Sequence, residues 1–132
     1  MNRLKSFPFL TSQQFLLILR ITLGLFMMAH GTTRLYVNSL EGFGEFLNSK
    51  GFIIGYFLAW SVTIFDIAGG ALLATGYFTK IICMAFIFVL LMGIILVHFQ
   101  NGWFVVGHQS GGIEYSVLLI ICLLLTASSE KK

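Results

Sequence analysis

The chain has 132 residues, of which 58% are hydrophobic and 10% are charged, and its formal net charge is +3 at pH 7. A soluble domain carries about 25% charged residues, so this chain has too little polar material to cover a water-exposed surface. The composition argues against a soluble globular domain and predicts an integral membrane protein surrounded by lipid. No basic run is interleaved with aromatic residues, which argues against nucleic-acid binding.

Four apolar segments follow one another along the chain, and each is predicted to form a helix. The expected helices are, in order, 13–36, 52–76, 79–99 and 111–127. A spanning helix needs about 20 residues, and the fourth segment is the shortest of the set. Thr11 and Gln14 have the spacing of a capping box before the first helix, and Gly76 is suited to end the second. The short connection after Gly76 predicts that the second and third helices are antiparallel neighbours.

The predicted fold class is all-α: one transmembrane domain, residues 1–132, folded as an antiparallel four-helix bundle. Orientation follows from the Lys and Arg residues near the helix ends, because the richer side faces the cytoplasm. Arg34 and Lys50 lie on one side. The basic residues on the other side are Arg3, Lys5, Lys80, Lys131 and Lys132. Both termini are therefore expected in the cytoplasm.

Two ionisable residues, Arg20 and Asp66, lie well inside the apolar segments. Measured from the cytoplasmic ends of their helices, they lie at depths of about 10 and 13 Å. A charge at the bilayer centre costs at least about 2.5–3.5 kcal/mol, so we predict an intramembrane ion pair between them. Gly69 and Gly70 share the helix face of Asp66 and are predicted to let a neighbouring helix pack closely. The pair has either a structural role or a direct role in chemistry or transport.

A second polar group gathers at the outer ends of the helices, and we treat it as a candidate outer polar site. His30 and Arg34 are four residues apart and share a helix face. His98, His108 and Glu114 surround the loop between the third and fourth helices. Glu114 stands at a helix start, where the dipole favours a negative charge, and Arg34 is its expected partner. The alternative is a set of ordinary interfacial residues that contact headgroups and water.

Neither the histidines nor the two cysteines have the spacing of a metal site. Imidazole and carboxylate groups suit zinc, iron or copper, but the sequence has no H-x-x-H or H-x-x-x-H spacing, so no metal site is predicted. Cys83 and Cys122 lie in apolar runs without a CxxC motif. We expect both to be small buried hydrophobic residues.

The order and spacing of these residues resemble the DoxX family of small four-helix membrane proteins, over about residues 13 to 127. The matching positions are Arg20 with Gly24, His30-Gly31-x-x-Arg34-Leu35, Asp66-x-x-Gly69-Gly70 with Gly76, and Gly112-x-Glu114-Tyr115. The chain departs from the family pattern at two positions, with Asp66 where Glu is usual and Arg34 where Lys is usual. Charge is kept at both positions, and Arg adds a planar fork of donors suited to an oxyanion.

The resemblance implies a multi-pass protein of the bacterial cytoplasmic (inner) membrane that belongs to an oxidoreductase system. The first hypothesis is a membrane or accessory subunit of a quinone-linked oxidoreductase, with quinone as the only cofactor. The sequence has no iron–sulfur cysteine set and no flavin fingerprint, so any other redox centre would belong to a partner protein. The alternatives are a scaffold subunit of a membrane or envelope assembly, and an anion or small-solute transporter acting as a homo-oligomer.

Overall fold

The computed structural model describes residues 6–131, and within that range it contains helices, turns and loops but no strand. Its five α-helices are α1 (Ser12–Tyr36), α2 (Leu40–Ser49), α3 (Gly55–Thr75), α4 (Thr79–Gly93) and α5 (Glu114–Ser129). After α4 the helix continues as a π-helical turn, η2 (Ile94–His98), and a 3-10 turn, η3 (Phe99–Asn101). Among the described residues, three helical segments are long and apolar enough to cross a membrane: Ser12–Tyr36, Gly55–Thr75 and Thr79–Asn101. With 16 residues, α5 is shorter.

The helix ends follow from local side-chain chemistry. Thr11 and Gln14 form the predicted capping box, with Gln14 N donating to Thr11 Oγ1 over 3.3 Å and Thr11 N donating to Gln14 Oε1 over 2.8 Å. Gly76 ends α3 in the left-handed conformation at φ 87°, which costs a glycine little because it has no Cβ. The N-cap of α4 is Phe78, which makes no side-chain capping bond.

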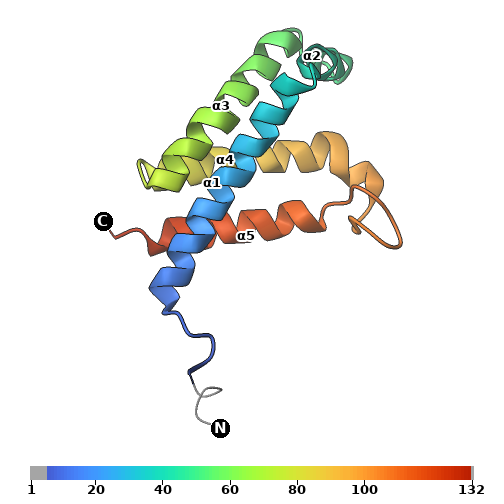
Figure 1. Cartoon of the computed structure of the whole chain (residues 1–132). Helices are drawn as coiled ribbons and strands as arrows, with labels where there is room; N and C mark the ends of the chain where they lie inside the picture. The colour runs from blue at the N-terminus through green and yellow to red at the C-terminus, as the bar shows by residue number, and fades with distance from the viewer. Residues whose placement is uncertain (1–5, 132) are drawn as a thin grey trace.

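The helix that the sequence reading missed is α2. Its apolar residues recur at helical spacing at Leu40, Phe43 and Leu47, and this face packs on α3 around Ala59. Gly44 lies against the backbone of Tyr56, where an added Cβ would come within 2.9 Å of the Tyr56 Cα. This close backbone contact fixes α2 on the N-terminal end of α3 (Figure 1).

The four longer helices pack as two antiparallel pairs that cross each other (Figure 1). In the first pair α1 runs alongside α3, and in the second α4 runs alongside α5. The expected neighbours α3 and α4 do contact each other, but they do not run alongside each other, because the turn after Gly76 directs α4 toward α5. Figure 1 also shows the N-terminal turns of α1 continuing past the end of α3 and across α5.

Glycines set the register of α1 against α3. Gly24 packs against Gly70 so tightly that a Cβ at Gly24 would lie 2.5 Å from the Gly70 carbonyl oxygen. A Cβ at Gly31 would lie 2.7 Å from Cγ1 of Ile67 and 2.9 Å from the carbonyl oxygen of Thr63. Gly69 instead contacts the Phe65 ring of its own helix. The two backbones therefore approach closely at two levels, as small residues allow in membrane bundles.

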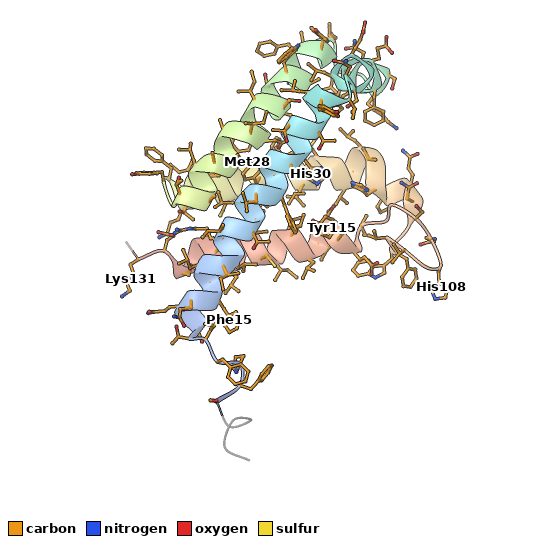
Figure 2. All side chains as sticks on the ribbon, in the orientation of Figure 1. Phe15, Met28, His30, His108, Tyr115 and Lys131 are labelled. Carbon is orange, nitrogen blue, oxygen red and sulfur yellow. The ribbon has the colours of Figure 1, made fainter. Side chains whose placement is uncertain are left out.

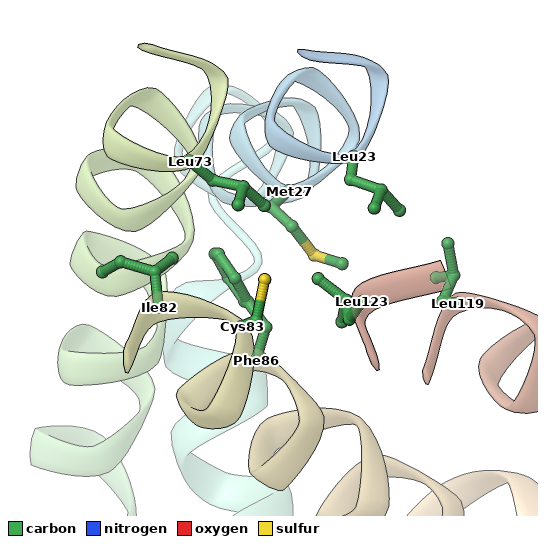
Figure 3. Packing of buried hydrophobic residues seen from close by; sticks show 8 residues of the cluster. All are labelled: Leu23, Met27, Leu73, Ile82, Cys83, Phe86, Leu119 and Leu123. Carbon is green, nitrogen blue, oxygen red and sulfur yellow. The ribbon is translucent and has the colours of Figure 1, made fainter. Parts of the chain in front are cut away.

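All four longer helices contribute to one hydrophobic core (Figure 3). Its buried members are Leu23, Met27, Leu73, Ile82, Cys83, Phe86, Leu119 and Leu123. Phe65 packs against the core with its ring 4.5 Å from that of Phe86. Cys83 is fully buried and Cys122 is half-buried. Many large apolar side chains of α4 and α5 remain exposed, as expected for helices whose outer faces contact lipid.

Candidate functional site

The partner of the buried Asp66 carboxylate is Arg34. The Arg34 Nη1 atom lies 3.2 Å from Asp66 Oδ2, and it also donates a hydrogen bond of 2.8 Å to the Thr63 hydroxyl. Gly31, one turn before Arg34 on α1, makes this possible because a Cβ there would lie 3.0 Å from the Asp66 Cβ. The close contact at Gly31 brings α1 near enough to α3 for Arg34 to reach the carboxylate.

The predicted Arg20–Asp66 pair is wrong. Arg20 Nη1 instead lies 3.2 Å from Glu130 Oε1, just after α5, and its guanidinium lies over Gly76. Gly76 follows Asp66 by ten residues, about 15 Å along a helix, so Arg20 is far from the depth of Asp66. The prediction assumed that the cytoplasmic ends of the two helices are level, but α1 extends beyond α3 (Figure 1).

Three contacts fix the Arg34 guanidinium in place. Nη1 uses its two hydrogens on Thr63 and Asp66, and the ring of Phe43 from α2 lies 4.7 Å from Cζ. An aromatic face attracts a cation at this distance. Nε and Nη2 make no hydrogen bond with any residue of the described range 6–131. Nη1 thus binds α3, and Nε and Nη2 remain available as hydrogen-bond donors.

The pair lies at the boundary between the protein interior and an open pocket. The Asp66 side chain is 6% exposed and the Arg34 side chain 20% exposed. The carboxylate is therefore enclosed between α1 and α3, whereas the guanidinium reaches the surface. Charge-assisted hydrogen bonds are stronger than neutral ones, and in this apolar setting they offset part of the cost of burying the two charges.

A pocket of about 500 Å³ runs along α1 beside Arg34. Its lining residues are Phe26, Ala29, His30, Thr33, Arg34, Ser39 and Tyr115. Phe26 and Arg34 are eight residues apart, which corresponds to about 12 Å along the helix. The polar lining lies at the Arg34 end and the apolar lining at the Phe26 end. The pocket therefore matches an amphiphilic molecule whose hydrogen-bonding head lies beside the guanidinium.

The structure divides the candidate outer polar site. His30 and Arg34 share the pocket, and Tyr115 at the start of α5 completes it. His98, His108 and Glu114 do not line this pocket. In Figure 2, His30 and Tyr115 lie toward the middle of the molecule, whereas His108 lies at the tip of the loop before α5.

The remaining three residues of the predicted outer group lie in this loop or in the helical segments at its two ends. The expected Arg34–Glu114 pair is wrong, because Glu114 Oε1 accepts a hydrogen bond of 2.9 Å from the backbone nitrogen of Val105. His98 Nδ1 lies 2.8 Å from the Gly111 carbonyl oxygen and acts as the donor. His108 is exposed, with its ring 5.1 Å from that of Phe104. These contacts hold the loop together.

Sequence reasoning did not identify Thr63, Phe43 or Tyr115 as parts of the site. Thr63 precedes Asp66 by three residues, the spacing at which helical side chains share a face, and this signal could have identified it. Phe43 was missed together with α2. Tyr115 was noted only within the family pattern, and the packing of α5 beside α1 brings it to the pocket. Within residues 6–131, no group of three or more His, Cys, Asp or Glu side chains is arranged to hold a metal ion.

Comparison with known protein families finds a match. The family model described as DoxX matches residues 15–99. The chain belongs to the DoxX family. The matched range contains Arg34, Asp66 and every other site residue of α1, α2 and α3, and it ends before α5. No curated protein and no solved structure matches the chain. This DoxX protein is thus an integral membrane protein with an all-helical fold.

Proposed function

We propose that this DoxX protein is the membrane or accessory subunit of a quinone-linked oxidoreductase system in a bacterial cytoplasmic membrane, and that the pocket beside Arg34 holds the quinone ring. The observation that carries the proposal is the pairing of unused guanidinium donors with an amphiphilic pocket. Arg34 Nε and Nη2 have no partner in the described chain, and Arg34 lines the polar end of the pocket. A quinone carbonyl is a hydrogen-bond acceptor that suits these donors.

The place of the pocket supports a ligand dissolved in the bilayer. Five of its seven lining residues belong to α1, a helix long and apolar enough to cross the membrane. The exposed Phe26 marks its apolar end, where an isoprenoid tail would leave the pocket and enter lipid. Phe43 of α2 covers one face of the Arg34 guanidinium and shields that face from water.

Two donors on α1 match the two carbonyl groups of a para-quinone. His30 and Arg34 both line the pocket, and residues four apart on a helix are separated by about 6 Å along its axis. The two carbonyl oxygens of a para-quinone lie at opposite ends of the ring, so two donors spaced along one helix can each bind one of them. In this arrangement Arg34 would bind one carbonyl and His30 the other. The electrons would come from a partner subunit, because the sequence contains no iron–sulfur or flavin motif.

The test is native mass spectrometry of the protein gently extracted from its own membrane. We expect bound quinone, an oxidoreductase subunit, or both in the spectrum of the parent protein. His30→Gln is expected to retain less quinone than the parent, whereas His108→Gln, a matched change outside the pocket, retains as much. A spectrum with phospholipid only overturns the proposal. A co-purifying partner without redox chemistry, and without quinone, would favour the scaffold hypothesis instead.

A further inference from the structure

Thr63 is a fully buried residue whose hydroxyl has a fixed direction. It is 0% exposed, and its Oγ1 donates a hydrogen bond of 2.8 Å to the carbonyl oxygen of Ala59, four residues earlier in α3. A threonine hydroxyl carries one hydrogen and two lone pairs. Because the hydrogen is used within the helix, only lone pairs face Arg34. Thr63 therefore acts toward the guanidinium as an acceptor of fixed orientation.

Thr63 and Asp66 together hold a single nitrogen of Arg34. Nη1 lies 2.8 Å from Thr63 Oγ1 and 3.2 Å from Asp66 Oδ2. A planar guanidinium held by one contact through one nitrogen can still turn about that contact. A second acceptor on the same nitrogen fixes the plane, and the Phe43 ring lies against the guanidinium at 4.7 Å. Since the group is rigid, fixing Nη1 also fixes the directions of Nε and Nη2.

We propose that Thr63 is a positioning residue that directs the free Nε and Nη2 donors of Arg34 into the pocket. Asp66 supplies the charge that keeps Arg34 at this depth, and Thr63 sets which edge of the guanidinium the pocket presents. The identity of the ligand, a quinone carbonyl, rests on the proposed function. The orientation of Arg34 does not depend on that identity, and it can be measured separately.

Three variants separate this role from a general packing role. Thr63→Val removes the hydroxyl and keeps the shape, and Thr63→Ser keeps the hydroxyl. Thr126→Val is the matched control, because Thr126 on α5 is 1% exposed and donates an equivalent hydrogen bond of 2.8 Å to Cys122. The loss of a buried, helix-bonded hydroxyl is common to both valine variants. Only Thr63→Val removes an acceptor from Arg34.

The first readout is the binding of a short-chain ubiquinone analogue to each variant in lipid nanodiscs. We expect Thr63→Val to bind at least about tenfold more weakly than the parent, because an Arg34 side chain that can turn loses its charged hydrogen bond to the ligand. Thr63→Ser and Thr126→Val should bind within about twofold of the parent, a difference well under 1.4 kcal/mol. If the parent binds the analogue, equal binding by Thr63→Val and Thr126→Val overturns the inference.

The second readout is the side-chain nitrogen NMR spectrum of Arg34, which needs no ligand. The chain has only three arginines, Arg3, Arg20 and Arg34, so assignment needs few variants. We expect separate, slowly exchanging Nη signals for Arg34 in the parent and in Thr63→Ser, and averaged signals in Thr63→Val. If the parent binds no quinone but Thr63→Val still averages these signals, the proposed function fails and the positioning role stands. Unchanged Arg34 signals in Thr63→Val overturn the positioning role.

Discussion

Replacing Asp66 by Asn is expected to destabilise the protein far more than the same change at Glu130. Both carboxylates pair with an arginine at an N–O distance of 3.2 Å. The two pairs differ in burial, because the Asp66 side chain is 6% exposed and the Glu130 side chain 31% exposed. Asp66→Asn and Glu130→Gln each remove one negative charge at nearly constant shape. The comparison therefore isolates the effect of burial on an ion pair.

The expected magnitudes follow from the environment of each pair. Removing one partner of a fully buried pair costs about 3–5 kcal/mol, because it leaves an uncompensated charge. Arg34 is 20% exposed and keeps its bond to Thr63, so we expect about 2–3 kcal/mol for Asp66→Asn, below the fully buried range. The partly exposed Arg20–Glu130 pair lies at the end of α5, and exposed pairs contribute about 0–1 kcal/mol. We therefore expect less than about 1 kcal/mol for Glu130→Gln.

Reversible unfolding in mixed micelles of a mild detergent and SDS measures both differences on one scale. The parent, Asp66→Asn and Glu130→Gln are titrated under identical conditions, with helix content as the signal. Asp66→Asn is expected to unfold at a clearly lower SDS fraction than the other two proteins. If Asp66→Asn and Glu130→Gln unfold together, the Arg34–Asp66 contact contributes no more than a surface pair, and the reasoning from burial fails.

Three further outcomes are expected. Gly31→Ala should lose about 1–3 kcal/mol of stability, because a Cβ there would lie 2.7 Å from Ile67. The control Gly42→Ala on α2 should not lower the stability, because an added Cβ there has nothing within 4 Å. Equal losses in the unfolding titration would contradict this packing argument. In a variant without native cysteines, a cysteine at Glu45 should react with an impermeant maleimide from outside the cell and one at Lys80 only after lysis; the reverse pattern would refute the predicted orientation. Arg34→Lys should unfold near the parent yet bind the quinone analogue at least about tenfold more weakly, and unchanged binding would show that one donor is enough.

The sequence predicted local features of the fold well because short-range chemistry determines them. The capping box at Thr11 and the left-handed Gly76 depend only on residues a few positions away, and the structure contains both. Length and hydropathy likewise identified the apolar segments that form α1, α3 and α4. The helix α2 was missed because its apolar spacing covers only ten residues, too few to span a membrane.

The partners of the charged residues could not be predicted from depth alone. Depth was counted from helix ends, yet α1 and α3 align where Gly24 and Gly31 let the backbones approach, and their ends are offset. This offset exchanges the partners, so Asp66 pairs with Arg34 and not with Arg20. A rule that aligned the glycines of the two helices before comparing depths would have favoured the observed pair. The crossing of α4 and α5 over the first pair depends on tertiary packing, which no local pattern contains.

The proposed use of Arg34 for both folding and binding rests on the geometry of its guanidinium. Nη1 is bound to α3 through Thr63 and Asp66, and the other two nitrogens have no partner in the described chain. A ligand that accepts from Nε or Nη2 needs no rearrangement of the contacts that hold α1 to α3. It therefore binds a donor whose ordering cost was met during folding, which favours affinity. A lysine, which is usual at this position in the family pattern, has only one nitrogen to share between the helix and the pocket, so Arg34 adds donors that a lysine lacks.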